Sequence, residues 1–98
     1  HSRNVCIFAD GEVDRSATGS GVSARAALHA FRDELKANQE ITIESILDTT
    51  MTVKIVEDTT YGPHKAVIPQ VSGKAHITGQ NKFYFDPNDK LKNGFILR

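Results

Sequence analysis

Apolar and polar residues follow two different periods along this chain. Over residues 21–37 apolar residues recur at helical spacing, which predicts a helix whose buried stripe is formed by Ala24, Ala27, Leu28, Phe31 and Leu35. Elsewhere, short runs of β-branched and aromatic residues between turn residues predict strands. The expected strands cover residues 5–8, 41–49, 52–58, 65–71, 74–78, 82–86 and 95–97.

The order of these elements favours an α+β fold. One strand precedes the helix and the others follow it through short turns, which disfavours a repeating βαβ arrangement. We expect strands to wrap around one enclosed helix. Val53 and Ile55 should share a buried strand face, and Pro69 predicts a sheet edge or a bulge because proline cannot donate a ladder hydrogen bond.

The composition narrows the class of protein. The 98 residues carry zero formal net charge, whereas nucleic-acid-binding domains usually show a basic excess, and no apolar run reaches the roughly 18 residues of a membrane span. Nucleic acid and membrane are therefore not expected partners. The single cysteine, Cys6, excludes an internal disulfide and favours a reducing, cytoplasmic location. Cys6 is predicted to be a small core residue in a doubly buried strand over residues 5–8.

The candidate site is the corner where the helix begins. Gly19, Ser20 and Gly21 stand at its first turn, where backbone N–H groups lack intrahelical partners and the helix dipole favours anions. The glycines carry no Cβ, so a ligand can approach the backbone closely. The polar residues of 14–18 surround the same corner. We therefore expect an anion-binding site over residues 14–21.

Other motif interpretations fit less well. GSGVSA, residues 19–24, matches the glycine pattern of a dinucleotide-binding fingerprint, but no strand ends directly before it. A P-loop would need lysine after Gly21, where Val22 stands. The histidines at 29, 64 and 76 lack metal-ligand spacing, so no metal site is expected. A serine nucleophile at Ser16 or Ser20 lacks a neighbouring histidine motif.

DRSATGSGVSAR, residues 14–25, resembles the second active-site motif of the proline racemase family, and VSGKAHITG (71–79) and DPNDKLKNGFILR (86–98) resemble its C-terminal strands. The resemblance covers nearly the whole chain, at the C-terminal end of the family. It implies a two-lobed, diaminopimelate-epimerase-like fold in which each lobe is a β-barrel-like sheet around a central helix. Residues 1–98 would form a single lobe, with the substrate held between it and an N-terminal lobe.

The resemblance also implies roles for individual residues. Gly19 and Ser20, with Gly21 beside them, would hold the substrate carboxylate through backbone N–H groups. Asp14 would contact the ring amine of an imino acid; the alternative is a structural role at the helix entry. Phe8 would form part of the pocket wall; the alternative is plain core packing. Arg15 would brace the corner, and no metal or organic cofactor is implied.

Thr18 decides the subclass. Family racemases have a cysteine at this position, one of two thiols that exchange protons with the α-carbon. A threonine hydroxyl is a far weaker acid than a thiol, whose ordinary pKa is about 8.5. The Thr-containing branch resembles trans-3-hydroxy-L-proline dehydratases, in which one cysteine removes the α-proton and the 3-hydroxyl leaves as water. Thr18 would hydrogen-bond the ligand or help to place the leaving group.

The family's other catalytic cysteine belongs to a Met-Cys-Gly-His type motif, which is absent here, and Cys6 does not match it. We therefore expect an enzyme lobe that is inactive alone, exposes the apolar face meant for its partner lobe and self-associates, with a homodimer as a possible assembly. The alternatives are a lobe of a proline or 4-hydroxyproline racemase or epimerase, which Thr18 disfavours, and a non-catalytic binding protein of the same fold.

Overall fold

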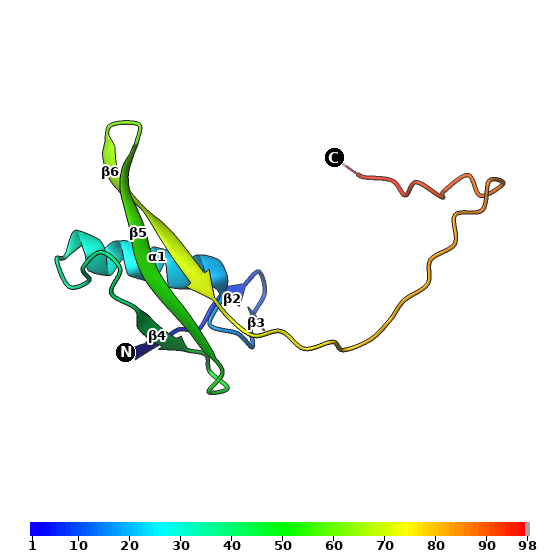
Figure 1. Cartoon of the computed structure of the whole chain (residues 1–98). Coiled ribbons are helices and arrows are strands. Elements are labelled where there is room, and N and C mark those ends of the chain that lie inside the picture. Colours follow the sequence, from blue (N-terminus) through cyan, green and yellow to red (C-terminus); the bar gives the residue numbers. More distant parts are fainter. Residues whose placement is uncertain (98) are drawn as a thin grey trace.

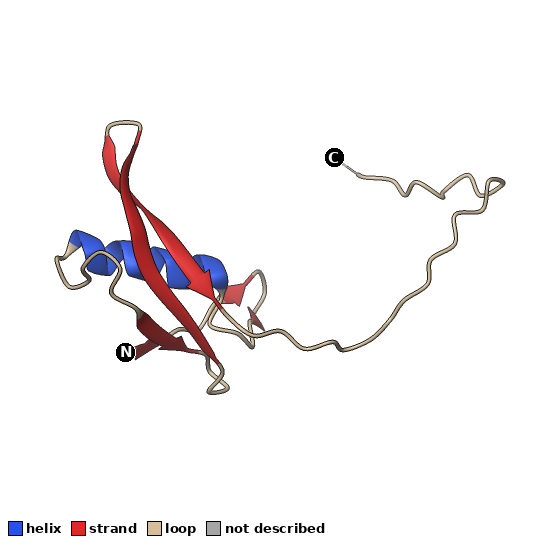
Figure 2. Ribbon diagram, in the orientation of Figure 1, coloured by secondary structure: helices blue, strands red, loops and turns tan. Residues whose placement is uncertain are grey.

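The structure is a computed structural model that describes residues 1–97. Within these residues the main sheet has the strand order β1-β4-β5-β6, and β2 and β3 form a separate hairpin. The helix α1 lies across β5 and β6 on one face of the main sheet (Figures 1 and 2). The elements are β1 (Ser2–Arg3), β2 (Ile7–Phe8), β3 (Glu12–Val13), α1 (Gly19–Phe31), β4 (Ile41–Glu44), β5 (Thr50–Tyr61) and β6 (His64–Ser72).

The core lies between α1 and this face of the sheet. Val53 and Ile55 of β5 are buried while Lys54 between them is less so, as the two-residue period of a strand requires. This confirms the predicted alternation. The other buried apolar residues are Ala17, Val22, Ala26, Leu35, Ile41 and Ile43.

The sheet ends at β6, where Pro69 lies. The strand order places β6 at the edge, and the pairing register shifts between Ile55 and Glu57, next to the point where Ile55 faces Pro69. Proline lacks the N–H that a ladder hydrogen bond needs, so both features accommodate it. The predicted edge position and irregularity are confirmed, although β5 is longer than residues 52–58.

The helix is shorter than the predicted span of residues 21–37. It ends at Phe31 because Asp33 adopts a left-handed conformation, with φ of 59°. The Asp33 N–H donates to the Ala30 carbonyl at 3.1 Å and the Glu34 N–H donates to the His29 carbonyl at 2.8 Å. These two bonds form a Schellman motif, which closes a helix C-terminus.

The predicted buried stripe of the helix is wrong at four of its five residues; the fifth, Leu35, is buried but lies beyond the end of α1. Val22 and Ala26 face the core, whereas Ala24, Ala27, Leu28 and Phe31 are exposed. The main sheet covers one side of α1, and no other layer within residues 1–97 covers the opposite side (Figure 1). We call this uncovered side, formed by the four exposed residues, the outer face of α1.

The first predicted strand is also corrected. β2 comprises only Ile7–Phe8 and pairs with β3, and its side chains are exposed, while Cys6 is half-buried. A two-stranded hairpin without a covering layer cannot bury either of its faces. The predicted doubly buried strand and fully buried Cys6 are therefore wrong for this part of the chain.

Residues 73–97 leave the sheet as an extended segment, which we call the C-terminal arm (Figure 1). The three strands predicted there are not formed, and the arm's large apolar side chains are exposed, with Ile77 at 96% and Phe83 at 79%. Strands require a neighbour for their backbone hydrogen bonds, and residues 1–97 offer the arm none. Arg98, the last residue of the DPNDKLKNGFILR segment, lies outside the described residues.

β4 ends at Glu44, short of the predicted residue 49. Beyond it, the buried Ser45 hydroxyl accepts the N–H groups of Leu47 at 3.1 Å and Thr49 at 3.2 Å, which bends the chain into the turn before β5. Among residues 1–97 there is also no helix with the length and apolar character that crossing a bilayer demands.

Candidate active site

The corner between β3 and α1 is held by hydrogen bonds centred on Asp14. Its Oδ1 accepts the Ser16 backbone N–H at 2.8 Å, and its Oδ2 accepts the Thr18 hydroxyl at 2.7 Å. The Ser16 hydroxyl accepts the Thr18 backbone N–H at 3.0 Å. The structure thus joins Asp14 and Thr18, the two predicted catalytic residues, by a direct side-chain contact.

Thr18 has an unusual backbone. Its φ is 63° and its ψ is 113°, outside the common regions for a β-branched residue, and only 8% of the residue is exposed. Such a conformation costs about 1–3 kcal/mol and persists only when its surroundings hold it. Here the Thr18 carbonyl accepts the Val22 N–H at 2.8 Å, which starts the helix, while its N–H is held by Ser16.

The N-terminus of α1 is exposed and has no side-chain cap. Thr18 is the N-cap residue, but its side chain does not cap the helix, since the hydroxyl is bonded to Asp14, and the first turn carries no acidic residue. A Cβ added at Gly19 would meet no atom within 4 Å in the described residues, and Gly19 and Ser20 are exposed. The first backbone N–H groups, together with the helix dipole, therefore present partial positive charge to the space in front of the helix.

The Asp14 carboxyl has a lowered pKa. The main cause is the hydrogen bond from the Ser16 backbone N–H, followed by the bonds from the Thr18 hydroxyl and the Ser16 side chain, and the charge of Arg15 adds to them. These contacts favour the charged form. Asp14 is consequently an ionised carboxylate at neutral pH, beside an uncapped helix N-terminus. Opposite charges this close together suit a zwitterionic small molecule.

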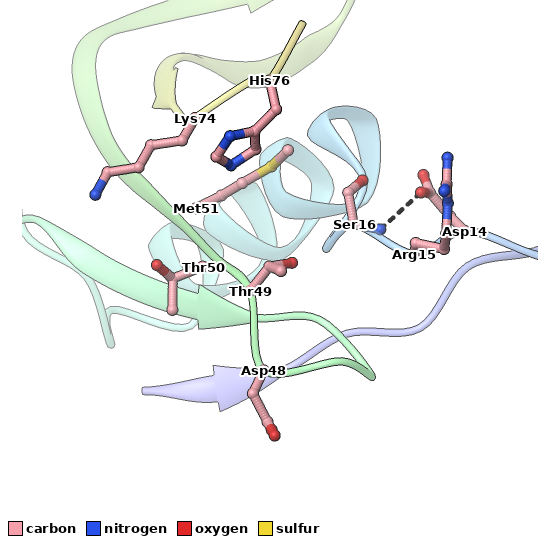
Figure 3. Close-up of a pocket in the computed structure, with 9 residues that line it drawn as sticks. All are labelled: Asp14, Arg15, Ser16, Asp48, Thr49, Thr50, Met51, Lys74 and His76. Atoms are coloured by element: carbon pink, nitrogen blue, oxygen red, sulfur yellow. Dashed lines mark hydrogen bonds between the residues drawn. The ribbon is translucent and has the colours of Figure 1, made fainter. Parts of the chain in front are cut away.

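A cavity of about 560 Å³ lies beside the corner. Three segments line it: residues 14–16, residues 48–51 before and within β5, and the start of the C-terminal arm (Figure 3). Figure 3 shows Lys74 and His76 of the arm across from Ser16. Residues 48–51, Lys74 and His76 were not predicted from the sequence, because they carry no motif and reach the cavity only through the fold.

The other predicted residues lie around this corner. Gly21 lines a second hollow of about 310 Å³, together with Cys6 and with Ala24 and Leu28 of the outer face of α1. Phe8 is 48% exposed on the β2–β3 hairpin and lines neither hollow. Arg15 is exposed at the rim of the first cavity. Within residues 1–97 no group of three or more His, Cys, Asp or Glu side chains could hold a metal ion.

Comparison with known proteins identifies relatives of the whole chain. A sequence model of the proline racemase family matches residues 1–96. The chain is 51% identical over 98 residues to a trans-3-hydroxy-L-proline dehydratase of Colwellia psychrerythraea, with all of this chain and 28% of the relative covered. It is 48% identical over 97 residues to a proline racemase of Clostridioides difficile, with 98% of this chain and 29% of the relative covered.

The fold comparison agrees. A hydroxyproline epimerase from Agrobacterium vitis, solved with bound trans-4-hydroxy-L-proline, superposes with a TM-score of 0.78 at 33% identity, covering 97% of this chain and 27% of that structure. The α+β lobe expected from the sequence is confirmed. The chain spans under a third of the length of these relatives. Its sequence and its fold show that the chain belongs to the proline racemase family.

Proposed function

We propose that residues 1–98 form the C-terminal lobe of a trans-3-hydroxy-L-proline dehydratase. The observation that carries this proposal is Thr18, which stands at the motif position of a racemase cysteine and whose hydroxyl donates a hydrogen bond to Asp14. Identity alone does not separate the activities, since a dehydratase and a racemase match this chain almost equally well. The chemistry of Thr18 does separate them.

Racemisation requires an acid and a base on opposite sides of the α-carbon. The threonine hydroxyl is a poor acid, and the neighbouring Asp14 carboxylate makes its ionisation harder still, because like charges repel. Thr18 therefore cannot serve as the second acid–base group. Elimination needs only one base at the α-carbon, so a site with Thr18 retains that reaction.

In the proposed reaction, a cysteine supplied by the N-terminal lobe takes the α-proton and the C2–C3 double bond forms as the C3–O bond breaks. The proton lost from C2 and the hydroxyl lost from C3 together make the released water, so the reaction needs no further reagent. The product is Δ1-pyrroline-2-carboxylate, in equilibrium with its enamine. Cys6 is not the proposed base, since it lies before the hairpin and lines the second hollow.

The substrate is an imino acid zwitterion. We assign its carboxylate to the backbone N–H groups of Gly19 and Ser20, with Gly21 beside them, and its ring ammonium to Asp14. The uncapped start of α1 and the ionised Asp14 support this assignment. The exposed ring of Phe8 is proposed to form part of the wall once the other lobe is in place.

The N-terminal lobe is the proposed partner of this one, in a cytoplasmic enzyme that pairs as a homodimer. The outer face of α1 and the apolar C-terminal arm support a partner, because a lone domain rarely leaves so much apolar surface uncovered. The isolated 98 residues should accordingly be inactive. Dehydration of trans-3-hydroxy-L-proline by the isolated chain would contradict this.

Replacement of Thr18 by cysteine in the complete protein tests the subclass. Thr18→Cys restores a thiol at the second position and should allow proline racemisation that the unmodified protein lacks, whereas Thr18→Ser should not. Formation of D-proline from L-proline by the unmodified protein, without dehydration of trans-3-hydroxy-L-proline, would instead support the alternative racemase or epimerase lobe. Absence of both activities would support a binding protein.

A further inference from the structure

We propose that Asp14 is a positioning residue which fixes the Thr18 hydroxyl as a hydrogen-bond acceptor toward the ligand, so that the two side chains share the N–H groups of the substrate ring ammonium. The inference rests on the proposed function and adds to it the direction of one hydrogen bond. It also gives Thr18 a role in binding, and separates that role from departure of the leaving group.

The hydrogen-bonding groups of the two side chains limit what Thr18 can offer a ligand. A threonine hydroxyl has one proton and two lone pairs, and an ionised carboxylate only accepts. The Thr18 proton is committed to Asp14 Oδ2 at 2.7 Å. What remains on the Thr18 oxygen is acceptor capacity alone, so a ligand group that bonds to it must be a donor.

A hydrogen bond to the other carboxylate oxygen fixes the orientation of the Asp14 side chain. Asp14 Oδ1 is engaged by the Ser16 backbone N–H at 2.8 Å, so the carboxylate cannot rotate freely. The Thr18 backbone is held in turn by Ser16 and by the first helical hydrogen bond to Val22. Thr18 is also nearly buried, which restricts the alternatives open to its side chain.

Of the two charged groups of the substrate, only the ring ammonium can donate a hydrogen bond to the Thr18 oxygen. Its carboxylate has no proton to give and cannot bond to Thr18 in this orientation. The ring ammonium carries two N–H groups, and the two acceptor oxygens, Asp14 Oδ2 and Thr18 Oγ1, lie 2.7 Å apart. A donor group that reaches one of them can present its second proton to the other. Since Asp14 is ionised, the pair holds only the weakly acidic Thr18 hydroxyl proton, which is committed to Asp14 and is not released to a departing hydroxyl.

The direction of the bond can be reversed with one substitution. In Asp14→Asn the side-chain oxygen stays with the Ser16 N–H, which places the amide NH₂ opposite Thr18. The Thr18 hydroxyl would then accept from the amide and turn its own proton toward the ligand. The site would change from one that takes ring donors to one that also tolerates a ring acceptor.

Two ligands that differ only at the ring atom test this in the complete protein. L-Proline has two ring N–H groups, whereas (S)-tetrahydrofuran-2-carboxylate has a ring oxygen that only accepts; neither carries a 3-hydroxyl. Calorimetric titration should show that the unmodified protein strongly prefers L-proline. Asp14→Asn should bind the oxygen ligand more tightly than the unmodified protein does, and Thr18→Val in the Asp14→Asn background should abolish that gain.

Further variants separate positioning from folding. Thr18→Val keeps the β-branched shape and should weaken L-proline binding about tenfold while leaving the oxygen ligand unaffected, because one bond from a charged donor is lost. Thr18→Ser should restore the preference. Asp58→Asn, an exposed carboxylate at the far end of β5, is the matched control and should change neither ligand.

The outcomes distinguish this inference from the proposed function. If the complete protein dehydrates trans-3-hydroxy-L-proline but Thr18→Val weakens both ligands equally, Thr18 acts only through structure and the inference fails alone. Persistence of the gain in the double variant would show that the substituted amide, and not the Thr18 hydroxyl, donates to the ring oxygen, which also overturns the inference. If the complete protein neither dehydrates trans-3-hydroxy-L-proline nor binds L-proline, the proposed function and this inference fail together.

Discussion

Gly19 offers a substitution whose effects on stability and on binding should have opposite signs. It is the first residue of α1, its φ lies outside the left-handed region, and an added Cβ would meet no atom within 4 Å. Alanine fits that backbone and reduces the freedom of the unfolded chain, so Gly19→Ala should raise the free energy of unfolding by about 0.4–1 kcal/mol. Folding alone therefore favours alanine at this position.

Binding should respond in the other direction. The open space in front of Gly19 is where the substrate carboxylate is proposed to meet the backbone N–H groups. A methyl group there would displace the carboxylate from at least one charge-assisted hydrogen bond, worth about 1.5–3 kcal/mol. The KM for trans-3-hydroxy-L-proline should rise by about ten- to a hundredfold, since 1.4 kcal/mol is a factor of ten.

Urea unfolding and steady-state kinetics on the complete protein measure the two effects. Ser23→Ala is the control, because it changes a residue of the same helix, bonded to the Gly19 carbonyl at 2.8 Å, without placing a methyl in front of the helix. It should leave KM unchanged. A more stable Gly19→Ala protein with unaltered KM would refute the carboxylate site, and a destabilised one would refute the backbone described for Gly19.

Three further predictions follow from other parts of the chain. Because the pKa of Asp14 is lowered in the folded protein, its hydrogen bonds should stabilise the fold above the ordinary carboxyl pKa of about 4, and this stabilisation should be lost as the pH falls further. The difference in unfolding free energy between the unmodified protein and Asp14→Asn should therefore shrink from pH 7 to pH 3. A difference that stays constant would contradict this. Ser45→Ala removes the acceptor of the Leu47 and Thr49 N–H groups, and two lost hydrogen bonds should cost about 2 kcal/mol in urea unfolding. The exposed Ser72→Ala should cost almost nothing, and equal effects would refute the role of the Ser45 turn. The isolated chain should self-associate in sedimentation velocity, and Phe31→Ser on the outer face of α1 should weaken the association; monomers at high concentration would argue against an interface there.

The parts of the fold that the sequence predicts well are those whose partners lie within the chain. Val53 and Ile55 alternate with polar residues and pack on α1, and Pro69 marks the edge strand. The helix face was mispredicted because α1 is rich in alanine on all sides, so Ala26 and Ala27 cannot be ranked by period alone. Its end was mispredicted because the left-handed turn falls at Asp33, which carries no stronger signal than Asn38.

The C-terminal arm shows a different limit. Its alternation around Phe83 and Phe85 has the pattern of a strand, but a strand forms only against a neighbour, and residues 1–97 provide none. A pattern encodes the tendency to pair and not the location of the partner. The same reasoning explains the exposed outer face of α1.

At the site, the motif was enough to single out Asp14 and Thr18. It could not show that their side chains bond at 2.7 Å or that the Thr18 φ is 63°, because both depend on the path of the chain from β3 into α1. The far wall of the cavity could not be predicted either. Asp48, Lys74 and His76 come from distant segments that only the β4–β5 turn and the course of the arm bring near Ser16.

We propose above all that Thr18 leaves the site capable of elimination and incapable of racemisation. The most direct measurement supplies the complete protein with trans-3-hydroxy-L-proline and L-proline in parallel and follows both products by chiral chromatography. We predict that Δ1-pyrroline-2-carboxylate forms from trans-3-hydroxy-L-proline and that no D-proline forms from L-proline. Formation of D-proline without any dehydration would contradict it.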